Sequence, residues 1–550
     1  MASYLSKEHI TANPNFNRWL VPPAALAVHL SIGMAYGFSV FWKPLGNALI
    51  GADGKPLAAC AAGATTFGDK LQGTLRALTA TDCNWTQFDL GWMYTLFFVL
   101  LGCSAALWGS WLERSGPRKA GLVSALCWCG GLLISAFGIY SHQLWMMWLG
   151  SGVIGGIGLG LGYISPVSTL IKWFPDKRGM ATGMAIMGFG GGAMIGSPLA
   201  TKLMATFAVE INGVSHPGIW QTFVALAVIY AVFMIGGSLG YRVPPNGWKP
   251  AGWNPSISNG NSMIASKHVH LANAHKTPQF WLLWLVLCMN VSAGIGIIGA
   301  AAPMLQETFG GALIAQHGTP EYSLGFADIK KDEVLVAAAA AVGAGFVGLI
   351  SLFNIFGRFF WASASDKLGR QRTYTIFFVL GALLYITASQ AAGIKSLGLF
   401  VACFCLIASM YGGGFATIPA YLADLFGTQF VGAIHGRLLT AWSTAGIVGP
   451  GIVNYMHDIR QETKVPFADI YAPIFYVLAV MLVIGFIANL MVKPVADKYF
   501  MTEEELAIEK KLAHEKSITA IEVTGVAEKT PLLTSLAWLA VGIPISNGIW

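Results

Sequence analysis

Twelve long apolar runs dominate the sequence, and each is about as long as a helix that crosses a bilayer. The runs cover residues 19–42, 88–110, 119–140, 144–166, 179–205, 219–240, 278–302, 337–363, 372–392, 397–423, 432–456 and 470–492. A barrel strand needs only about 10 residues, so runs of this length predict helices. Charged residues make up 11% of the chain, against roughly 25% in soluble proteins. We therefore expect an all-α polytopic membrane protein embedded in a lipid bilayer.

The Lys and Arg residues predict the orientation of these spans. They gather in alternate connections, including 114–119, 172–178 and 367–372, whereas the short turns 141–143 and 206–218 contain none. Positive loops stay on the cytoplasmic side. The N-terminus is polar, with no cleavable signal peptide, and we expect it to be cytoplasmic in a bacterial inner (plasma) membrane. The net charge of +7 reflects this topology, and no basic tract indicates a nucleic-acid partner.

A polar linker divides the chain into two halves. We expect a cytoplasmic N-terminus at 1–18, six-helix halves at 19–240 and 278–492, a cytoplasmic linker at 241–277, a polar tail with a short helix at 493–530, and an apolar segment at 531–550. The last segment is long enough to span, but it contains Pro544, so a further span and an interfacial segment both remain open. Cys60 and Cys83 share a long outer loop, where they either pair or stay reduced.

The two halves repeat each other. Glu113 and Asp366 follow the second and eighth spans in similar loops, and they are 253 residues apart. Gly179 and Gly432 begin the fifth and eleventh spans, and the same 253 residues separate them. One offset for two markers indicates a duplicated carrier. The expected gating residues of the two loops are Gly109, Glu113, Arg114, Gly116, Arg118, Asp366, Lys367, Gly369 and Arg370.

Arg358 is the only charged residue deep in the predicted spans. An arginine at mid-bilayer costs about 3 kcal/mol on insertion scales, so such a residue indicates function. Its guanidinium matches a carboxylate in a two-bond fork. Ser351, Asn354 and Arg358 form one polar stripe along the helix. The alternative is that the Arg358 side chain extends to the inner interface.

Other side chains suit a site for a small anion. Tyr36, Tyr163, Tyr411 and Trp442 are candidates for an aromatic cage, and each is equally compatible with plain packing. His29 either carries a proton or bonds neighbouring helices. We expect no Asp or Glu deep in a span, no metal and no cofactor. The chain shows no enzyme motif, so we expect no enzymatic activity.

Several stretches resemble the major facilitator superfamily and, within it, the oxalate/formate antiporter family. The paired loops GSWLERSGPRK and ASASDKLGR carry the first resemblance; KWFPDKRGMATGMAIMGFGGGA and FNIFGRFFWASASDKLGR carry the second. The resemblance implies a fold of twelve spans in two six-helix halves. It also implies that Arg358 binds a substrate carboxylate and that Tyr36 is a first-span aromatic of the site. Where the family has a second cation, this chain has Trp442, and Arg437 lies one turn earlier.

We therefore expect a carrier that exchanges small carboxylates of the oxalate and formate type by alternating access, acting as a monomer. One cation balances one carboxylate, so a monocarboxylate fits the charge better than the oxalate dianion. Two alternatives remain: a proton-coupled monocarboxylate symporter for formate- or pyruvate-like acids, and a carrier-like carboxylate sensor that binds without flux.

Overall fold

The computed structural model describes most of the chain. The described residues are 7–51, 56–62, 67–211, 214–245, 247–252, 263–265, 267–316, 318–329 and 331–509. The predicted apolar segment at 531–550 lies outside them, as does the end of the predicted tail helix. The tail helix begins as expected: Thr502 and Glu505 form a reciprocal capping pair, and residues 503–509 are helical.

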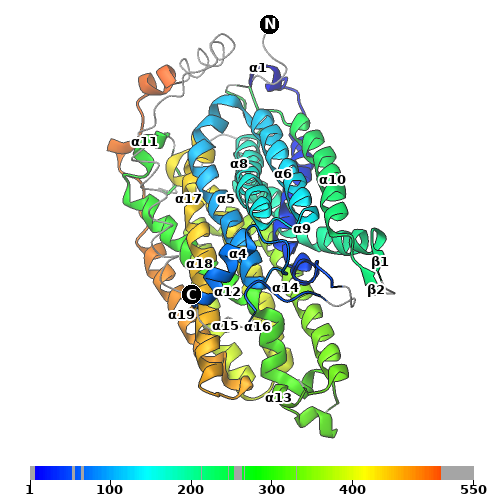
Figure 1. Cartoon of the computed structure of the whole chain (residues 1–550). Helices are drawn as coiled ribbons and strands as arrows, with labels where there is room; N and C mark the ends of the chain where they lie inside the picture. The colour runs from blue at the N-terminus through cyan, green and yellow to red at the C-terminus, as the bar shows by residue number, and fades with distance from the viewer. Residues whose placement is uncertain are drawn as a thin grey trace.

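Long helices make up both halves of the molecule (Figure 1). In the N-terminal half they are α2 (Val21–Ile32), continued by a 3-10 stretch (Gly33–Phe41), α5 (Gln87–Ser115), α6 (Pro117–Tyr140), α7 (Leu144–Met147), continued by a π-helical stretch (Trp148–Gly155) and α8 (Gly156–Trp173), α9 (Arg178–Thr206) and α10 (Ile219–Gly240). In the C-terminal half they are α12 (Pro278–Phe309), α14 (Glu333–Leu368), α15 (Arg370–Gly393), α16 (Leu397–Phe426), α17 (Val431–Leu438), α18 (Thr440–Glu462) and α19 (Ala472–Leu490).

Within the described residues, 11 helices are long and apolar enough to cross a membrane. They account for all but one of the predicted runs. The remaining run, 432–456, is formed by α17 and α18, which are separate helices that meet at Leu439. The run predicts one uninterrupted helix, and the structure corrects that expectation.

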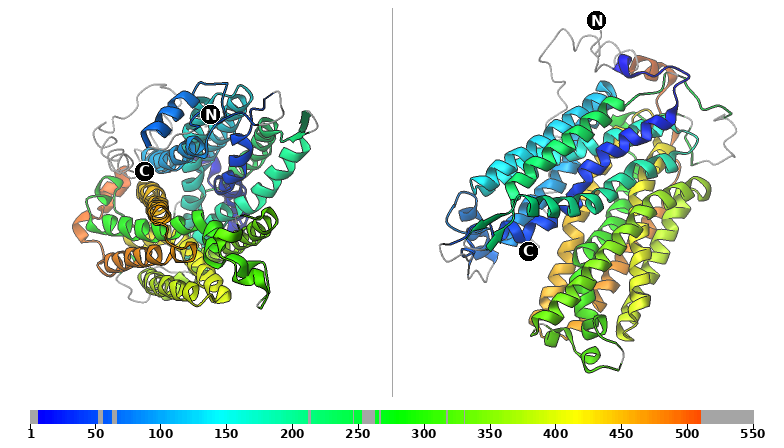
Figure 2. Two further views of the ribbon diagram at one scale, coloured as in Figure 1. Left: turned by 60° about the horizontal axis from the view of Figure 1, so that its bottom comes forward. Right: turned by 90° about the vertical axis from the view of Figure 1, so that its right-hand side faces the viewer.

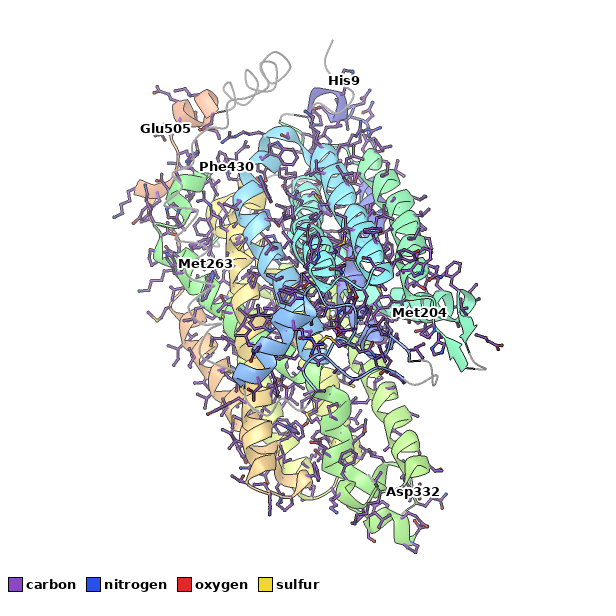
Figure 3. All side chains as sticks on the ribbon, in the orientation of Figure 1. His9, Met204, Met263, Asp332, Phe430 and Glu505 are labelled. Atoms are coloured by element: carbon purple, nitrogen blue, oxygen red, sulfur yellow. A yellow bond between two sulfur atoms is a disulfide. The ribbon has the colours of Figure 1, made fainter. Side chains whose placement is uncertain are left out.

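The two halves meet at one end of the bundle and diverge towards the other (Figure 2). We call the first end the linker face: it carries His9 and Glu505, and Asp332 lies at the opposite end, the loop face (Figure 3). Helices α14 and α9 pack together across the interface between the halves, as do α17 and α5. The side chains that close the linker face therefore come from these helices and their neighbours.

Short elements cover the loop face. They are α3 (Trp42–Gly46), α4 (Phe67–Ala77), the hairpin of β1 (Val209–Ile211) and β2 (Val214–His216), and α13 (Phe326–Ile329). The Cys60–Cys83 disulfide is present here. His142 lies beside this disulfide. Its ring stacks on that of Trp85, with 4.3 Å between the ring centres, and its Nε2 lies 2.9 Å from the carbonyl oxygen of Cys83.

Helix α12 is longer than its predicted run, which ended at residue 302. The extra turns bring Glu307 into the helix as a buried side chain, where it pairs with His457 of α18 at 3.0 Å. Glu307 lies in the last turn of α12, beyond the predicted run, so it does not contradict the expectation that no Asp or Glu lies deep in a span. A histidine partner explains how the carboxylate is accommodated.

The linker and the tail form a short layer on the linker face. Ala265 and Val269 donate main-chain hydrogen bonds to the carbonyl oxygens of Asp424 and Phe426, and Met501 donates one to His268. The four-residue helix α11 (Leu271–Ala274) is held by Arg437, whose guanidinium donates to the carbonyl oxygen of Leu271. The linker is thus attached to the ends of α16 and α17.

Candidate functional site

Arg358 lies at the interface between the halves, fully buried. Its Nε donates to Oδ1 of Asn354 one turn earlier, at 2.9 Å, and its Nη1 donates to the carbonyl oxygen of Ile186 in α9, at 3.3 Å. Nη2 has no hydrogen-bond partner among the described residues. The guanidinium therefore does not extend to the inner interface. It is held in place by two bonds and retains a donor for a further acceptor.

Three aromatic rings surround this guanidinium. Its carbon lies 5.5 Å from the ring centre of Phe415, 5.9 Å from that of Phe189 and 6.0 Å from that of Tyr36. An aromatic face stabilises a cation by roughly 0.5–1 kcal/mol at an exposed site and by about 2 kcal/mol when water is excluded. The rings thus offset part of the cost of burying a charge without neutralising it.

Two glycines leave the space that the Arg358 side chain occupies. A Cβ at Gly190 of α9 would lie 2.9 Å from Nε, and one at Gly412 of α16 would lie 3.1 Å from Cγ. Both distances are shorter than ordinary contacts between heavy atoms. The glycines on the faces of α9 and α16 therefore allow these helices to enclose a long cationic side chain.

The predicted cage residues come together around Arg358. Tyr36 belongs to the 3-10 stretch after α2, and its hydroxyl lies 3.5 Å from that of Tyr411 in α16. The Trp442 ring lies 6.3 Å from Tyr36, 5.4 Å from Tyr163 and 4.5 Å from Phe415. Tyr163 and Trp442 are fully buried, and their hydroxyl and Nε1 groups have no partner among the described residues. The site thus offers several polar groups within an aromatic lining.

His29 is buried beside this group, 5.4 Å from the Tyr163 ring. Its Nδ1 lies 2.5 Å from the carbonyl oxygen of Ala185, and its Nε2 lies 3.1 Å from that of Tyr163. Both oxygens belong to helices of the same half. The ring therefore connects α2 to α8 and α9.

Each half binds the other through an acid of the repeated loops. Asp366 accepts hydrogen bonds from the main-chain N–H groups of Gly179, at 2.8 Å, and Met180, at 2.9 Å. Glu113 accepts one from the N–H group of Gly432, at 3.1 Å. We call these contacts the Asp366 lock and the Glu113 lock. Both place a carboxylate at the N-terminus of a helix in the opposite half, where the helix dipole favours negative charge.

Basic residues complete the two locks. Lys172 pairs with Glu113, and Arg370 pairs with Asp366 at 2.6 Å. Asp424, at the end of α16, binds Arg178 of the opposite half at 2.8 Å and Arg370 at 3.0 Å. Ion pairs, together with hydrogen bonds from main-chain N–H groups, therefore hold the linker face closed across the interface.

The other predicted gating residues lie around these locks. Gly109 packs closely against Ala433 of α17, and Lys367 and Arg114 are exposed. Arg118 donates instead within its own half, to the carbonyl oxygens of Leu239 and Tyr241. Gly116 and Gly369 end α5 and α14 with φ of 84° and 86°, a backbone region that glycine adopts readily. The repeat thus extends to backbone conformation.

Several residues of this region were not predicted. Phe189 and Phe415 carry no signal that separates them from core aromatics. Asp424 lies one residue beyond the predicted end of its span, and its position next to a span end was the available signal. His435 lies in the polar beginning of the eleventh run. Among the described residues, no three His, Cys, Asp or Glu side chains gather as a metal site requires.

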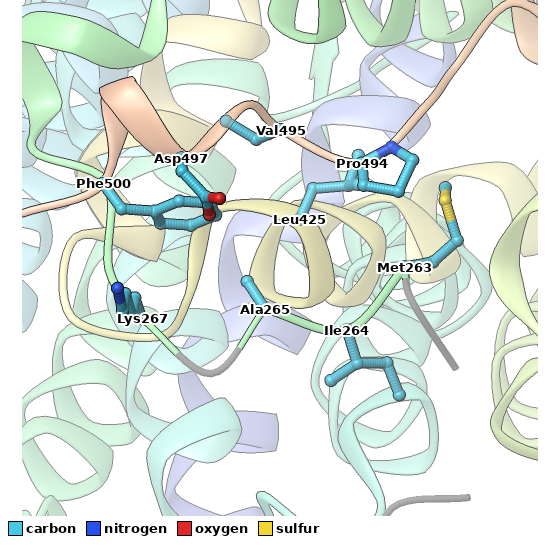
Figure 4. Close-up of a pocket in the computed structure, with 9 residues that line it drawn as sticks. All are labelled: Met263, Ile264, Ala265, Lys267, Leu425, Pro494, Val495, Asp497 and Phe500. Atoms are coloured by element: carbon cyan, nitrogen blue, oxygen red, sulfur yellow. The ribbon is translucent and has the colours of Figure 1, made fainter. Parts of the chain in front are cut away.

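A separate cavity of about 220 Å³ lies at the linker face (Figure 4). Linker residues such as Met263 and Lys267 form one wall, and Pro494, Asp497 and Phe500 of the tail form another. None of the predicted substrate-binding residues lines it. The cavity belongs to the contact between the linker and the tail.

The fold defines a polytopic carrier with two repeated halves that enclose a cationic site. The chain matches the Major Facilitator Superfamily over residues 57–327 and 291–547, and it belongs to that family. It is not an enzyme.

The chain is 27% identical over 375 residues to the uncharacterized MFS-type transporter YhjX of Escherichia coli (strain K12), covering 68% of this chain and 80% of that one. It is 26% identical to the oxalate:formate antiporter of Oxalobacter formigenes, covering 65% and 73%. It is 25% identical to apicoplast pyruvate carrier 1 of Toxoplasma gondii, covering 63% and 66%. The last two relatives support carboxylate transport in general terms.

Solved structures share the fold. The Major Facilitator Superfamily transporter FucP in the outward conformation aligns with a TM-score of 0.55 at 11% identity, over 87% of this chain and 100% of that one. The human organic anion transporter MFSD10 aligns with a TM-score of 0.54 at 14% identity, over 86% and 100%.

Proposed function

We propose that this protein exchanges small monocarboxylates across a membrane, with Arg358 as the group that binds the substrate carboxylate. The observation that carries the proposal is the buried Arg358 guanidinium, whose Nη2 has no partner among the described residues. A carboxylate would accept a charged hydrogen bond from it, and such bonds contribute about 1.5–3 kcal/mol. The relatives named as an oxalate:formate antiporter and a pyruvate carrier support the same substrate class.

Trp442 supports a monocarboxylate in preference to a dianion. It lies in the aromatic lining, 5.5 Å from the Phe189 ring, at the position where the resemblance implies a second cation. With one guanidinium in this lining, a second carboxylate would be buried without a positive partner. Such burial is strongly unfavourable. We therefore expect formate- or pyruvate-like acids to be favoured over oxalate.

The locks support alternating access. In this arrangement the Asp366 and Glu113 locks close the linker face, which we assign to the cytoplasmic side together with the N-terminus. Tyr36, in the lining beside Arg358, is half-buried, whereas Arg358 is fully buried. Substrate would enter from the loop face, bind at Arg358 and leave after the locks open.

The test is uptake of labelled formate, pyruvate and oxalate by purified protein in liposomes. The liposomes are preloaded with formate, with oxalate or with nothing. Arg358→Gln removes the charge, Arg358→Lys keeps the charge but loses the fork, and Arg372→Gln changes an exposed arginine of the same face as a matched control. A lost charged bond predicts an affinity roughly 10- to 150-fold weaker in Arg358→Gln.

Uptake that needs a preloaded carboxylate, and that disappears in Arg358→Gln but persists in Arg372→Gln, supports the proposal. Wild-type uptake by Arg358→Gln would refute the assigned role. Tight oxalate binding would contradict the interpretation of Trp442. Binding without flux under every loading would indicate the sensor.

A further inference from the structure

His435 is a buried imidazole that has no hydrogen-bond partner among the described residues while the linker face is closed. It lies on α17, is fully buried, and neither ring nitrogen has a hydrogen-bond partner among the described residues. Its ring is 5.9 Å from that of Tyr163. Proteins pair almost all buried polar groups, and an unpaired one costs about 1–3 kcal/mol. The arrangement therefore holds His435 at a cost that another arrangement would relieve.

The walls around His435 belong to both halves. Helix α17 approaches α5 so closely that a Cβ at Gly436 would collide with the carbonyl oxygen of Ala105. At Gly109 of α5, a Cβ would lie 2.8 Å from the Cα of Ala433. Tyr163 belongs to α8, which, like α5, is part of the N-terminal half. Opening the linker face must separate α17 from α5 and α8, and water would then reach the ring.

His29 provides the contrast. Both of its ring nitrogens lie against carbonyl oxygens of its own half, those of Ala185 and Tyr163. When the halves rock apart, these contacts move together with His29. Of the two buried histidines beside Tyr163, His435 is thus the one whose surroundings change with the conformation.

The charged groups around His435 are already engaged. Glu113, facing α17 from α5, binds Lys172 and the N–H group of Gly432. Arg437, two residues further along α17, donates to the linker, at the carbonyl oxygen of Leu271 and at His275. His29 and Tyr163 are the titratable groups that face the ring from α2 and α8. No carboxylate of the described residues lies within ion-pair distance of His435, so a positively charged ring would have no counter-charge in the closed arrangement.

We propose that His435 is a proton-binding site that fills when the linker face opens and that shifts the empty carrier towards the open arrangement as the pH falls. A proton from the water at the linker face binds to a ring nitrogen, and it returns to that water when the ring closes neutral. Proton binding at His435 does not depend on the proposed function.

The test measures opening of the linker face without any carboxylate. Nitroxide labels at Lys177→Cys and Lys367→Cys, two exposed positions in opposite halves, report the distance across that face. Between about pH 7.5 and about pH 5.5, one proton can shift the ratio of open to closed carrier by up to about 100-fold. We expect a shift of at least roughly tenfold towards the open state. His435→Gln removes the shift, and His435→Phe provides a second variant that keeps an aromatic ring.

Two controls separate the alternatives. His275 is a second titratable group at the same face: burial, then the neighbouring Arg437 and Lys276, lower its pKa. His275→Gln is expected to retain the shift. Arg358→Gln is also expected to retain it, because no substrate is present; this outcome holds even if the proposed function fails. An unchanged distance distribution in the wild type, or a shift that persists in both His435 variants, would overturn the proposal.

Discussion

The Asp366 lock makes a quantitative prediction for the variant Asp366→Asn. The carboxylate accepts two main-chain N–H bonds, at 2.8 and 2.9 Å, from the start of α9 in the opposite half. An asparagine oxygen can still accept one of them, but without the negative charge. One lost bond to a charged group contributes about 1.5–3 kcal/mol, and the lost interaction with the helix dipole contributes about 0.3–1 kcal/mol. Arg370 keeps Asp424 as its partner, at 3.0 Å.

Together these terms give a loss of about 2–4 kcal/mol, which corresponds to a shift of roughly 30- to 900-fold towards the open linker face. The Lys177→Cys and Lys367→Cys label pair measures this shift at a fixed pH near neutrality. The matched control is Asp82→Asn, which removes an exposed acid that pairs with Arg76 at the loop face. An Asp366→Asn distance distribution that matches the control would refute the reasoning, because it would show that the lock contributes nothing to closure.

Four further predictions test other parts of the structure. Gly190→Ala is expected to displace the Arg358 side chain, because the three atoms nearest to its Cβ all belong to that side chain, and so to weaken substrate binding more than it lowers stability; KM and the melting temperature separate the two effects. Gly357→Ala is expected to lower the melting temperature, because its Cβ would collide with main-chain atoms of Ser409, whereas Gly348→Ala meets nothing within 4 Å and serves as its control. Loss of the Cys60–Cys83 disulfide in Cys83→Ser is expected to reduce stability by about 3 kcal/mol, and reductant should reproduce the effect only in the wild type. Burial lowers the pKa of His142 from its ordinary value of 6.5, so the unfolded chain binds a proton that the folded loop does not; stability should fall as the pH drops below about 6.5, and His142→Asn, which tolerates the positive φ of 49°, should remove this slope.

Hydropathy predicted most of the fold, because a helix is the structure that satisfies every main-chain group of an apolar span. The repeat also placed Glu113 and Asp366 correctly at equivalent positions. The repeat could not show that Asp366 binds the start of α9 at Gly179, or that Glu113 binds the start of α17 at Gly432. Both contacts depend on how the two halves pack against each other. No Gly or Pro lies within two residues of Leu439, so the sequence does not show where the two helices separate.

The site was predicted in part, and for two different reasons. Arg358 stands out because a charge in an apolar run is costly, so composition alone draws attention to it. Tyr36, Tyr163, Tyr411 and Trp442 are ordinary aromatic residues in the sequence, and only the structure brings their rings together. His435 was missed because its run begins with polar residues that resemble the end of a loop. Its burial arises from the approach of α5 and α8, which are far from it in the sequence.

The internal repeat relates the two locks, so they lie on either side of the pseudo-symmetry axis. Because the two locks hold the halves together at two separate points of the interface, they resist rotation of one half against the other about that axis. If one is removed, the remaining lock becomes a pivot: the halves would swivel about it instead of parting evenly. A carrier with a single intact lock would therefore open along one edge, and the two possible single-lock carriers would open along opposite edges.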